Sequence, residues 1–346
     1  MRAIIQPHVS PAASPARRLA VAAGLAVALG ACGAASPTPA TRPPAAARRG
    51  ATAPADPAPR PATRLTVRAA GRMPAAVQLP AVTASDGGVL AMGGLDAADV
   101  SVANIVRVRG GRAATIGHLP RPLHDAAAAT VGGTVFFIGG GDAGSATPQI
   151  LHVASTGAAV AAGRLPAGAS DVEAATIGRT AYVVGGYTGT VALRSVLAFS
   201  PGRPVRVAAE LPQALRYAAV AAVDGDLLVA GGTSGAAATR AVLRFDPRTG
   251  LVRRIGTLPF GVTHAAGAAL GGWFYVLGGR GDGLSSQRAA ILAIDPRTGR
   301  VGRAGRLPIA VSDLGAATAG DRIVAVGGRD ARGGVHDEIW SLGAAR

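Results

Sequence analysis

Cysteine, lysine and aromatic residues are scarce in this sequence, and each scarcity excludes a class of protein. Cys32 is the single cysteine among 346 residues, so an intramolecular disulfide framework and a cysteine-based metal cluster are both impossible. Lysine is absent, and all 35 basic residues are arginine. Aromatic residues make up 3% of the chain, and no dense basic run is interleaved with them. The net charge of +16 therefore reflects an arginine-biased composition, and we expect no nucleic-acid binding.

The lone cysteine lies at the end of a hydrophobic segment near the N-terminus. Arg17 and Arg18 precede thirteen apolar residues, LAVAAGLAVALGA, at positions 19–31. This length is too short to span a bilayer but fits the apolar core of a secretion signal. The segment LGAC at 29–32 resembles a bacterial lipobox. That resemblance implies cleavage before Cys32 and lipidation of its sulfur.

We therefore expect residues 1–31 to be a lipoprotein signal peptide and Cys32 to anchor the protein to a bacterial cell membrane on the extracytoplasmic side. Two or more acyl chains anchor a protein stably, whereas one binds only marginally. The n-region of about twenty residues is long for this family. An ordinary cleaved signal with an incidental cysteine is the alternative. Residues 32–63 are rich in proline and alanine without apolar periodicity, which predicts a disordered tether.

From residue 64 onward the sequence repeats itself six times. In every unit, an apolar–proline pair is followed, nineteen residues after its proline, by a glycine doublet. The doublets are spaced by 46, 46, 46, 47 and 49 residues, and they are Gly93–Gly94, Gly139–Gly140, Gly185–Gly186, Gly231–Gly232, Gly278–Gly279 and Gly327–Gly328. Each unit contains four short strand-like segments, of which the first is rich in alanine and the second ends on the doublet. This pattern predicts an all-β, six-bladed propeller of four-stranded antiparallel blades over residues 64–346.

The glycine doublet at the end of a hydrophobic strand resembles the Kelch repeat. Arg121 and His124 add an R-x-x-H sequence after the proline of the second unit, and Tyr187 directly follows the third doublet. Kelch repeats commonly carry a tyrosine there and a tryptophan further on, but Trp273 and Trp340 lie elsewhere. We interpret the glycines as residues of blade packing and turns, where a side chain has no room or φ is positive.

The first segment of the repeat region predicts how the ring closes. Residues 63–74 resemble the fourth strands at 250–259 and 299–308, whereas the chain ends just after the third strand of the sixth unit. We therefore expect the N-terminal segment to be the outer strand of the last blade.

Two positions in each unit carry the candidate site residues. Four residues after the prolines stand Gln78, His124, Ser170, Arg216, Thr263 and Ser312, and five residues after them stand Leu79, Asp125, Asp171, Tyr217, His264 and Asp313. Repetition places these residues around the channel mouth, a default position for a ligand. The predicted ligand-binding residues are Gln78, His124, Asp125, Asp171, Arg216, Tyr217, His264 and Asp313. Loops after the doublets add Asp96, Asp142, Tyr187, Arg280, Asp282, Arg329 and Asp330.

The alternative is that these polar groups only cap the inner strands and line a water-filled channel. Carboxylates and imidazoles are cation ligands, but the pair spacings of dedicated metal loops are missing, so we expect neither a metal nor another cofactor. No motif identifies a catalytic residue.

Two classes of function fit this sequence. The first is a monomeric binding module that presents its loop face to a protein or glycan partner. The second is a carbohydrate-active enzyme of the sialic-acid mutarotase type, a six-bladed Kelch-like class. Arg216 would bind the anion, and Glu173 or an aspartate of the ring would be the acid–base group. A galactose-oxidase-like copper centre is excluded, because it needs a cysteine cross-linked to a tyrosine in the domain.

Overall fold

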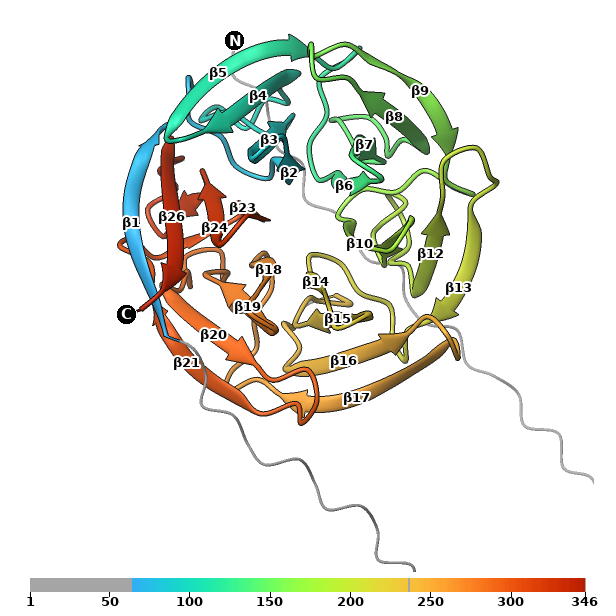
Figure 1. Ribbon diagram of the computed structural model, residues 1–346, viewed down its shortest axis with the longest axis vertical. Helices are drawn as coiled ribbons and strands as arrows, with labels where there is room; N and C mark the ends of the chain where they lie inside the picture. Colours follow the sequence, from blue (N-terminus) through green and yellow to red (C-terminus); the bar gives the residue numbers. More distant parts are fainter. Residues whose placement is uncertain (1–63, 236, 346) are drawn as a thin grey trace, which may run out of the picture. The chain divides into compact units, whose positions relative to one another are not determined.

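The structure, a computed structural model, describes residues 64–235 and 237–345. The predicted signal peptide, Cys32 and the tether lie outside these residues. Six four-stranded antiparallel sheets surround one axis (Figure 1). The prediction of an all-β, six-bladed propeller is confirmed. In this part of the chain, no helix is long and apolar enough to cross a membrane.

The strands form four concentric layers around the axis, and each blade contributes one strand to each layer. The innermost strands are β2 (Ala81–Ser85), β6 (Ala127–Val131), β10 (Glu173–Ile177), β14 (Ala219–Val223), β18 (Ala266–Leu270) and β23 (Gly315–Ala319). The second strands are β3 (Gly88–Met92), β7 (Thr134–Ile138), β11 (Thr180–Val184), β15 (Asp226–Ala230), β19 (Trp273–Leu277) and β24 (Arg322–Val326).

The outer half of each blade is built in the same way. The third strands are β4 (Asn104–Arg109), β8 (Gln149–Val153), β12 (Ser195–Phe199), β16 (Ala241–Asp246), β20 (Ala290–Ile294) and β26 (Glu338–Ala344). The outermost strands are β5 (Arg112–His118), β9 (Ala159–Arg164), β13 (Arg206–Glu210), β17 (Leu251–Thr257), β21 (Val301–Arg306) and β1 (Leu65–Arg72). A further short pair joins β22 (Val311–Ser312) to β25 (Arg329–Asp330).

Small residues on the inner strands let six blades meet near the axis. These strands line a channel of about 260 Å³, and its wall consists of alanine, threonine, valine and one glycine. Larger side chains fill the space between blades further out. Phe136 of β7 packs edge-on against Phe199 of β12, with ring centroids 4.9 Å apart, and Tyr182 packs similarly against Phe245 at 5.3 Å. The aromatic residues are few, and these serve blade-to-blade packing.

The glycine doublets are the points at which one blade is hydrogen-bonded to the next. Gly186 donates its N–H to the carbonyl of Leu215 in the following blade at 2.8 Å. A Cβ added to Gly185, whose φ is +59°, would lie 2.2 Å from that same carbonyl oxygen. The other five doublets repeat both relations, with the carbonyls of Leu123, Ala169, Val262, Val311 and Val77. The doublets therefore lie where the backbones of two neighbouring blades meet.

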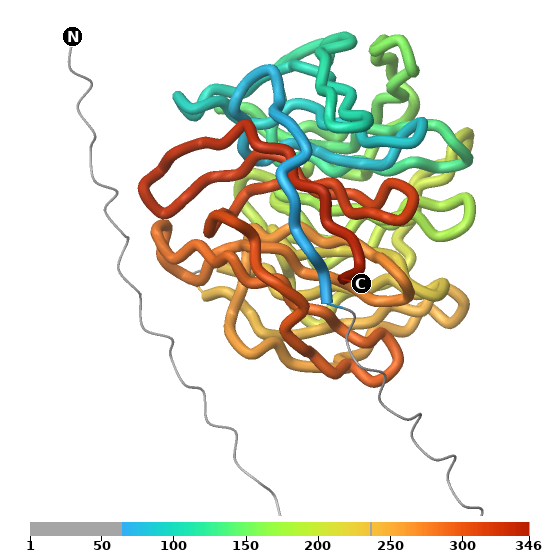
Figure 2. Tube along the Cα trace, turned by 60° about the vertical axis from the view of Figure 1, so that its left-hand side comes forward, coloured from blue at the N-terminus to red at the C-terminus, as the bar shows by residue number. Residues whose placement is uncertain are grey.

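The ring is closed by pairing the two ends of the described chain. β1 runs antiparallel to β26, from Leu65 opposite Ala344 to Arg72 opposite Glu338, with one register shift between Ala69 and Gly71. Figure 2 shows the blue first strand beside the red last strand. The predicted closure by an N-terminal outer strand is thus confirmed, and the ring has its complete set of strands within residues 64–345.

Candidate functional site

Six equivalent residues form a narrow ring where the fourth-to-first connections reach the channel. We call them the neck ring: Leu79, Asp125, Asp171, Tyr217, His264 and Asp313. Every one of them has a positive φ, between 54° and 62°. This left-handed conformation is unfavourable for residues other than glycine, so the surrounding structure must impose it.

Backbone hydrogen bonds between neighbouring blades accompany this conformation at most of the six positions. Four of the six N–H groups donate to the carbonyl of the preceding ring member: Tyr217 to Asp171 at 3.2 Å, His264 to Tyr217 at 3.1 Å, Asp313 to His264 at 2.9 Å and Leu79 to Asp313 at 2.7 Å. The neck ring is therefore a structural seam as well as a cluster of polar side chains.

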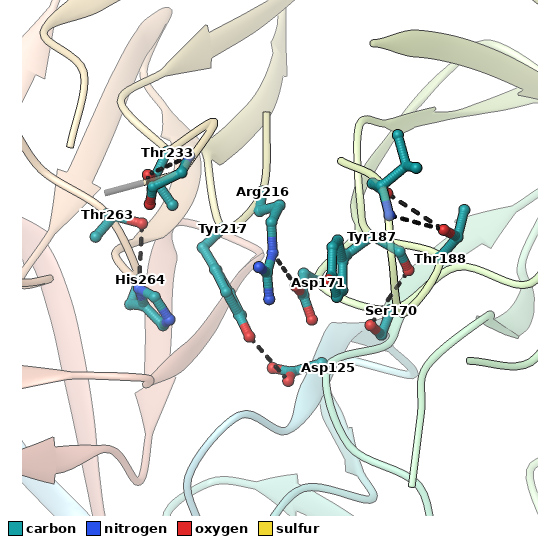
Figure 3. Close-up of polar contacts among 12 residues, drawn as sticks. Asp125, Ser170, Asp171, Tyr187, Thr188, Arg216, Tyr217, Thr233, Thr263 and His264 are labelled. Atoms are coloured by element: carbon teal, nitrogen blue, oxygen red, sulfur yellow. Dashed lines mark hydrogen bonds and ion pairs between the residues drawn. The ribbon is translucent and has the colours of Figure 1, made fainter. Parts of the chain in front are cut away.

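Tyr217 connects two blades across the neck. Its hydroxyl donates to Oδ2 of Asp125, two blades away, at 3.2 Å (Figure 3). Its ring stacks on His264, with centroids 3.6 Å apart and planes inclined by 22°. The cavity left at the neck has a volume of about 30 Å³, enough for a water molecule but not for a sugar. The neck between the loop face and the channel is thus narrow.

The carboxylates of the neck ring are deeply buried. The side chains of Asp125, Asp171 and Asp313 are 7%, 2% and 9% exposed. Burial raises the pKa of Asp125 well above its usual range, and the neighbouring Asp171 and Asp313 carboxylates raise it further. Burial also raises the pKa of Asp313. Oδ1 of Asp125 has no hydrogen-bond partner among the described residues.

Glu173 lies just below the neck ring, at the start of β10. Burial raises the pKa of its carboxyl group to about 8, a change only partly offset by a hydrogen bond from the backbone of Ala174. Glu173 therefore carries a proton near neutral pH and can donate it to a neighbouring group.

A larger cleft opens above the neck ring, between the fourth and fifth blades. This loop-face cleft has a volume of about 230 Å³ and is lined mainly by polar residues: Arg216, Tyr217, Thr233, Gly235, Ala238, Thr263, His264, Arg280, Gly281 and Asp282. Two of these side chains are cationic, and Asp282 is the single carboxylate among them. The cleft is the described cavity best suited to an anionic group of a ligand.

Arg216 is held in place by three neighbours. Its Nε donates to Oδ2 of Asp171 in a buried ion pair (Figure 3). Its guanidinium carbon lies 3.9 Å from the ring centroid of Tyr187 and 5.2 Å from that of Tyr217, which is cation–π geometry. Burial acts to lower the pKa of Arg216, but its interactions with Asp171 and Tyr217 together outweigh this effect, so the net change in pKa is upward.

Arg280 has no carboxylate partner among the described residues. Its Nη2 lies 3.2 Å from Nε2 of His264. Burial and the charges of Arg280 and Arg216 hold the pKa of His264 well below its usual range, so the imidazole is neutral. Because arginine can only donate, Nε2 accepts and the proton resides on Nδ1, which lies 3.1 Å from the hydroxyl of Thr263. Arg280 thus keeps donor groups available for a ligand.

The structure brings some of the predicted site residues together and separates others. Arg216, Tyr217 and His264 line the loop-face cleft, whereas Asp125, Asp171 and Asp313 lie in the neck below. Gln78 and His124 support loops: the Gln78 amide donates to Asp99 at 2.7 Å, and Nδ1 of His124 lies 2.8 Å from the Ser101 hydroxyl. Ligand binding by all eight residues stays a prediction.

Arg280 was predicted only as one of the loop residues after the doublets and Thr233 was not predicted, although both line the cleft. A signal for them exists in the repeat. The residue after each doublet forms a β-bridge with the residue four positions after the proline, as in Arg216 with Thr233 and Thr263 with Arg280. Taking these two positions as a pair would have identified Thr233 and placed Arg280 beside Thr263. Among the described residues, no group of three or more His, Cys, Asp or Glu side chains is arranged to hold a metal ion.

Comparison with known proteins agrees with this architecture. The Kelch motif model matches residues 214–259, which span the fourth blade. No curated protein matches the sequence. Among solved structures, 692 chains match. One, titled "Structure of YjhT", has a TM-score of 0.67 and 15% identity, and the match covers 78% of this chain and 95% of that chain. At this identity the likeness shows the fold alone.

Blade count, closure and the cleft on the loop face define the class as a six-bladed β-propeller. The Kelch motif match in the fourth blade and the six glycine doublets agree with a propeller whose blades resemble Kelch repeats. Because many chains share this fold, the fold does not specify a ligand.

Proposed function

We propose that the protein is a binding module whose loop-face cleft takes a carboxylate of a partner, best supplied by an acidic side chain of another protein. Arg280 carries this proposal, since its guanidinium faces the cleft without a carboxylate partner among the described residues. Arg216 adds a second positive charge held in a fixed position. Arginine's planar donor fork suits a carboxylate in two-point contact.

Exposed apolar residues on the loop face favour a protein partner over a small sugar. Val100, Val191 and Leu284 are 57%, 60% and 80% exposed. They lie in the loops that follow the doublets of the first, third and fifth blades, and thus on the same face as the cleft. Exposed apolar side chains around a polar centre can bury apolar surface against a protein partner. A monosaccharide is too small to cover them.

We expect Arg280→Gln to weaken binding of carboxylate-bearing probes about 10- to 100-fold, because a hydrogen bond to a charged group contributes about 1.5–3 kcal/mol. The probes are a glutamate-rich peptide, sialic acid and glucuronate, with galactose as the neutral comparison. Thermal shift and calorimetry measure binding. Arg179→Gln, a change at an exposed hairpin turn, is the matched control and should bind like wild type.

The outcomes separate the possible ligands. A shift with the peptide alone supports a protein partner, and a shift with the acidic sugars alone supports a glycan. The absence of binding to every acidic probe would overturn the proposal. Binding of galactose as tight as that of the acidic probes would also overturn it.

A carbohydrate-active enzyme of the sialic-acid mutarotase type is the second candidate, and Glu173 favours it. A carboxyl group with a pKa of about 8 suits proton transfer at neutral pH. However, Glu173 lines the small neck cavity, whereas Arg216 lines the loop-face cleft above it. The anion-binding and proton-transferring groups thus face different spaces, and this weakens the pairing on which the enzyme hypothesis depends.

We further propose that the module is lipid-anchored through Cys32 on the extracytoplasmic side of a bacterial membrane. The support is the LGAC sequence at the end of the apolar segment, and the fact that this cysteine is the single one in the chain. Cells labelled with palmitate should incorporate label into the wild-type protein but not into Cys32→Ala. Equal labelling of both forms would refute the anchor.

A further inference from the structure

The outermost strands of three successive blades carry a concentration of arginine. β17, β21 and β1 follow one another along the perimeter of the propeller (Figure 1). Together they hold six arginines and no acidic residue. We call this set the arginine rim: Arg68, Arg72, Arg253, Arg254, Arg303 and Arg306. All six residues are exposed.

Most of the arginine rim is not neutralised within the protein. Arg72 pairs with Asp337 at 2.7 Å and lies 3.9 Å from Glu338. The other five form no ion pair with a carboxylate among the described residues. Arg254 donates to the hydroxyl of Thr257 at 2.8 Å, which leaves its charge uncompensated. Five positive charges therefore face solvent on one side of the domain.

Protection of edge strands accounts for only part of this pattern. Charged residues on outer strands prevent edge-to-edge pairing, and all six blades need that protection. The outermost strands of the first three blades, β5, β9 and β13, carry one arginine each, and β13 also carries Glu210. The excess of arginine on β17, β21 and β1 is thus confined to one side of the propeller, and protection of edge strands does not require it.

We propose that the arginine rim binds an anionic phospholipid surface. Each arginine near such a surface adds about 1 kcal/mol, or about fivefold, to binding, and a curved row on three strands can contact many headgroups at once. The rim lacks acidic residues that headgroup phosphates would repel. This inference goes beyond the proposed function, because it needs neither the cleft nor the lipid at Cys32.

The position of the rim in the sequence agrees with this occupant. β1 is the first strand of the ring, so residues 1–63 join the domain at this rim. A lipid on Cys32 would therefore be joined to the domain through the strand that carries Arg68 and Arg72. The two contacts would act together, since a weak second contact strengthens a first one through effective concentration.

The test is co-sedimentation of the chain 33–346 with phosphatidylcholine vesicles that contain or lack phosphatidylglycerol. This chain includes the entire closed ring and lacks the proposed signal and lipid site, so failure of the anchor does not affect the result. We expect binding only to the anionic vesicles, with a strong decrease at high salt. The variant Arg68→Gln/Arg253→Gln/Arg303→Gln should bind about 100-fold more weakly, at about fivefold for each arginine.

A matched variant separates the rim from the overall charge. Arg112→Gln/Arg164→Gln/Arg206→Gln removes the same charge from the outermost strands of the first three blades and should bind nearly like wild type. Equal losses in both variants, or no binding to anionic vesicles, would overturn the proposal. Rim-dependent binding of heparin or duplex DNA without vesicle binding would also overturn it, in favour of a soluble polyanion.

Discussion

Deleting residues 64–73 should abolish the cooperative unfolding transition of the propeller, or lower its Tm by far more than any single substitution. This segment contains β1, which supplies the fourth strand of the sixth blade and pairs with β26 along its whole length. Without β1 the two chain ends no longer hold the first and last blades together, and Leu65, buried in the core, is lost. The expected loss is on the order of 5 kcal/mol or more, comparable with the whole stability of a domain.

Circular dichroism melts and denaturant titrations measure this effect. The control is a deletion of the same length, residues 50–59, which lies before the first strand of the ring and should leave Tm unchanged. If the 64–73 deletion melts at the wild-type temperature, the ring is not closed by β1.

Gly185→Ala should destabilise the domain by about 3–5 kcal/mol, a large effect for one methyl group. Two costs add at this position. An alanine at φ +59° costs about 1–2 kcal/mol. Its Cβ would also lie 2.2 Å from the carbonyl oxygen of Leu215, which must move although it accepts the N–H of Gly186. The substitution therefore disturbs the hydrogen bond that joins two blades.

Gly178→Ala isolates the backbone cost. Gly178 has nearly the same φ, +60°, but an added Cβ there meets no atom within 4 Å. It lies in the hairpin between β10 and β11, so its replacement should cost only about 1–2 kcal/mol. Guanidinium titration of both variants gives the difference, which is the cost of the contact between blades. Equal destabilisation by the two variants would mean that the doublet recurs in every repeat only because its φ is positive, and not because a side chain has no room there.

Much of the fold could be predicted because each blade is a local unit. The repeat of proline and glycine doublet locates the end of every second strand, and the four strand-like segments predicted in each unit match the four strands of each sheet. The Asp-Gly turn at 224–225 joins β14 to β15 with both residues at positive φ, as such a turn requires. These features depend on short stretches of sequence.

The site was predicted only as a ring of positions. The repeat placed Asp125, Tyr217 and Asp313 at one level, and the structure confirms that they share it. The repeat did not show that the Tyr217 hydroxyl reaches Asp125 across the neck, a contact between residues 92 positions apart. Nor did it separate the neck cavity from the cleft beside Arg280, because side-chain direction follows from the packing of neighbouring blades.

The sequence by itself determined the number of blades, the place of every glycine doublet and the strand that closes the ring. These features follow from the spacing of the repeat, and each doublet joins its own blade only to the adjacent one. Only the tertiary structure decided where the charges gather. In the sequence, arginines are spread along the chain and indicate no more than a biased composition. Ring closure brings β1 from the start of the domain beside β21 near its end, and Arg68 thereby joins Arg253 and Arg303 on one side.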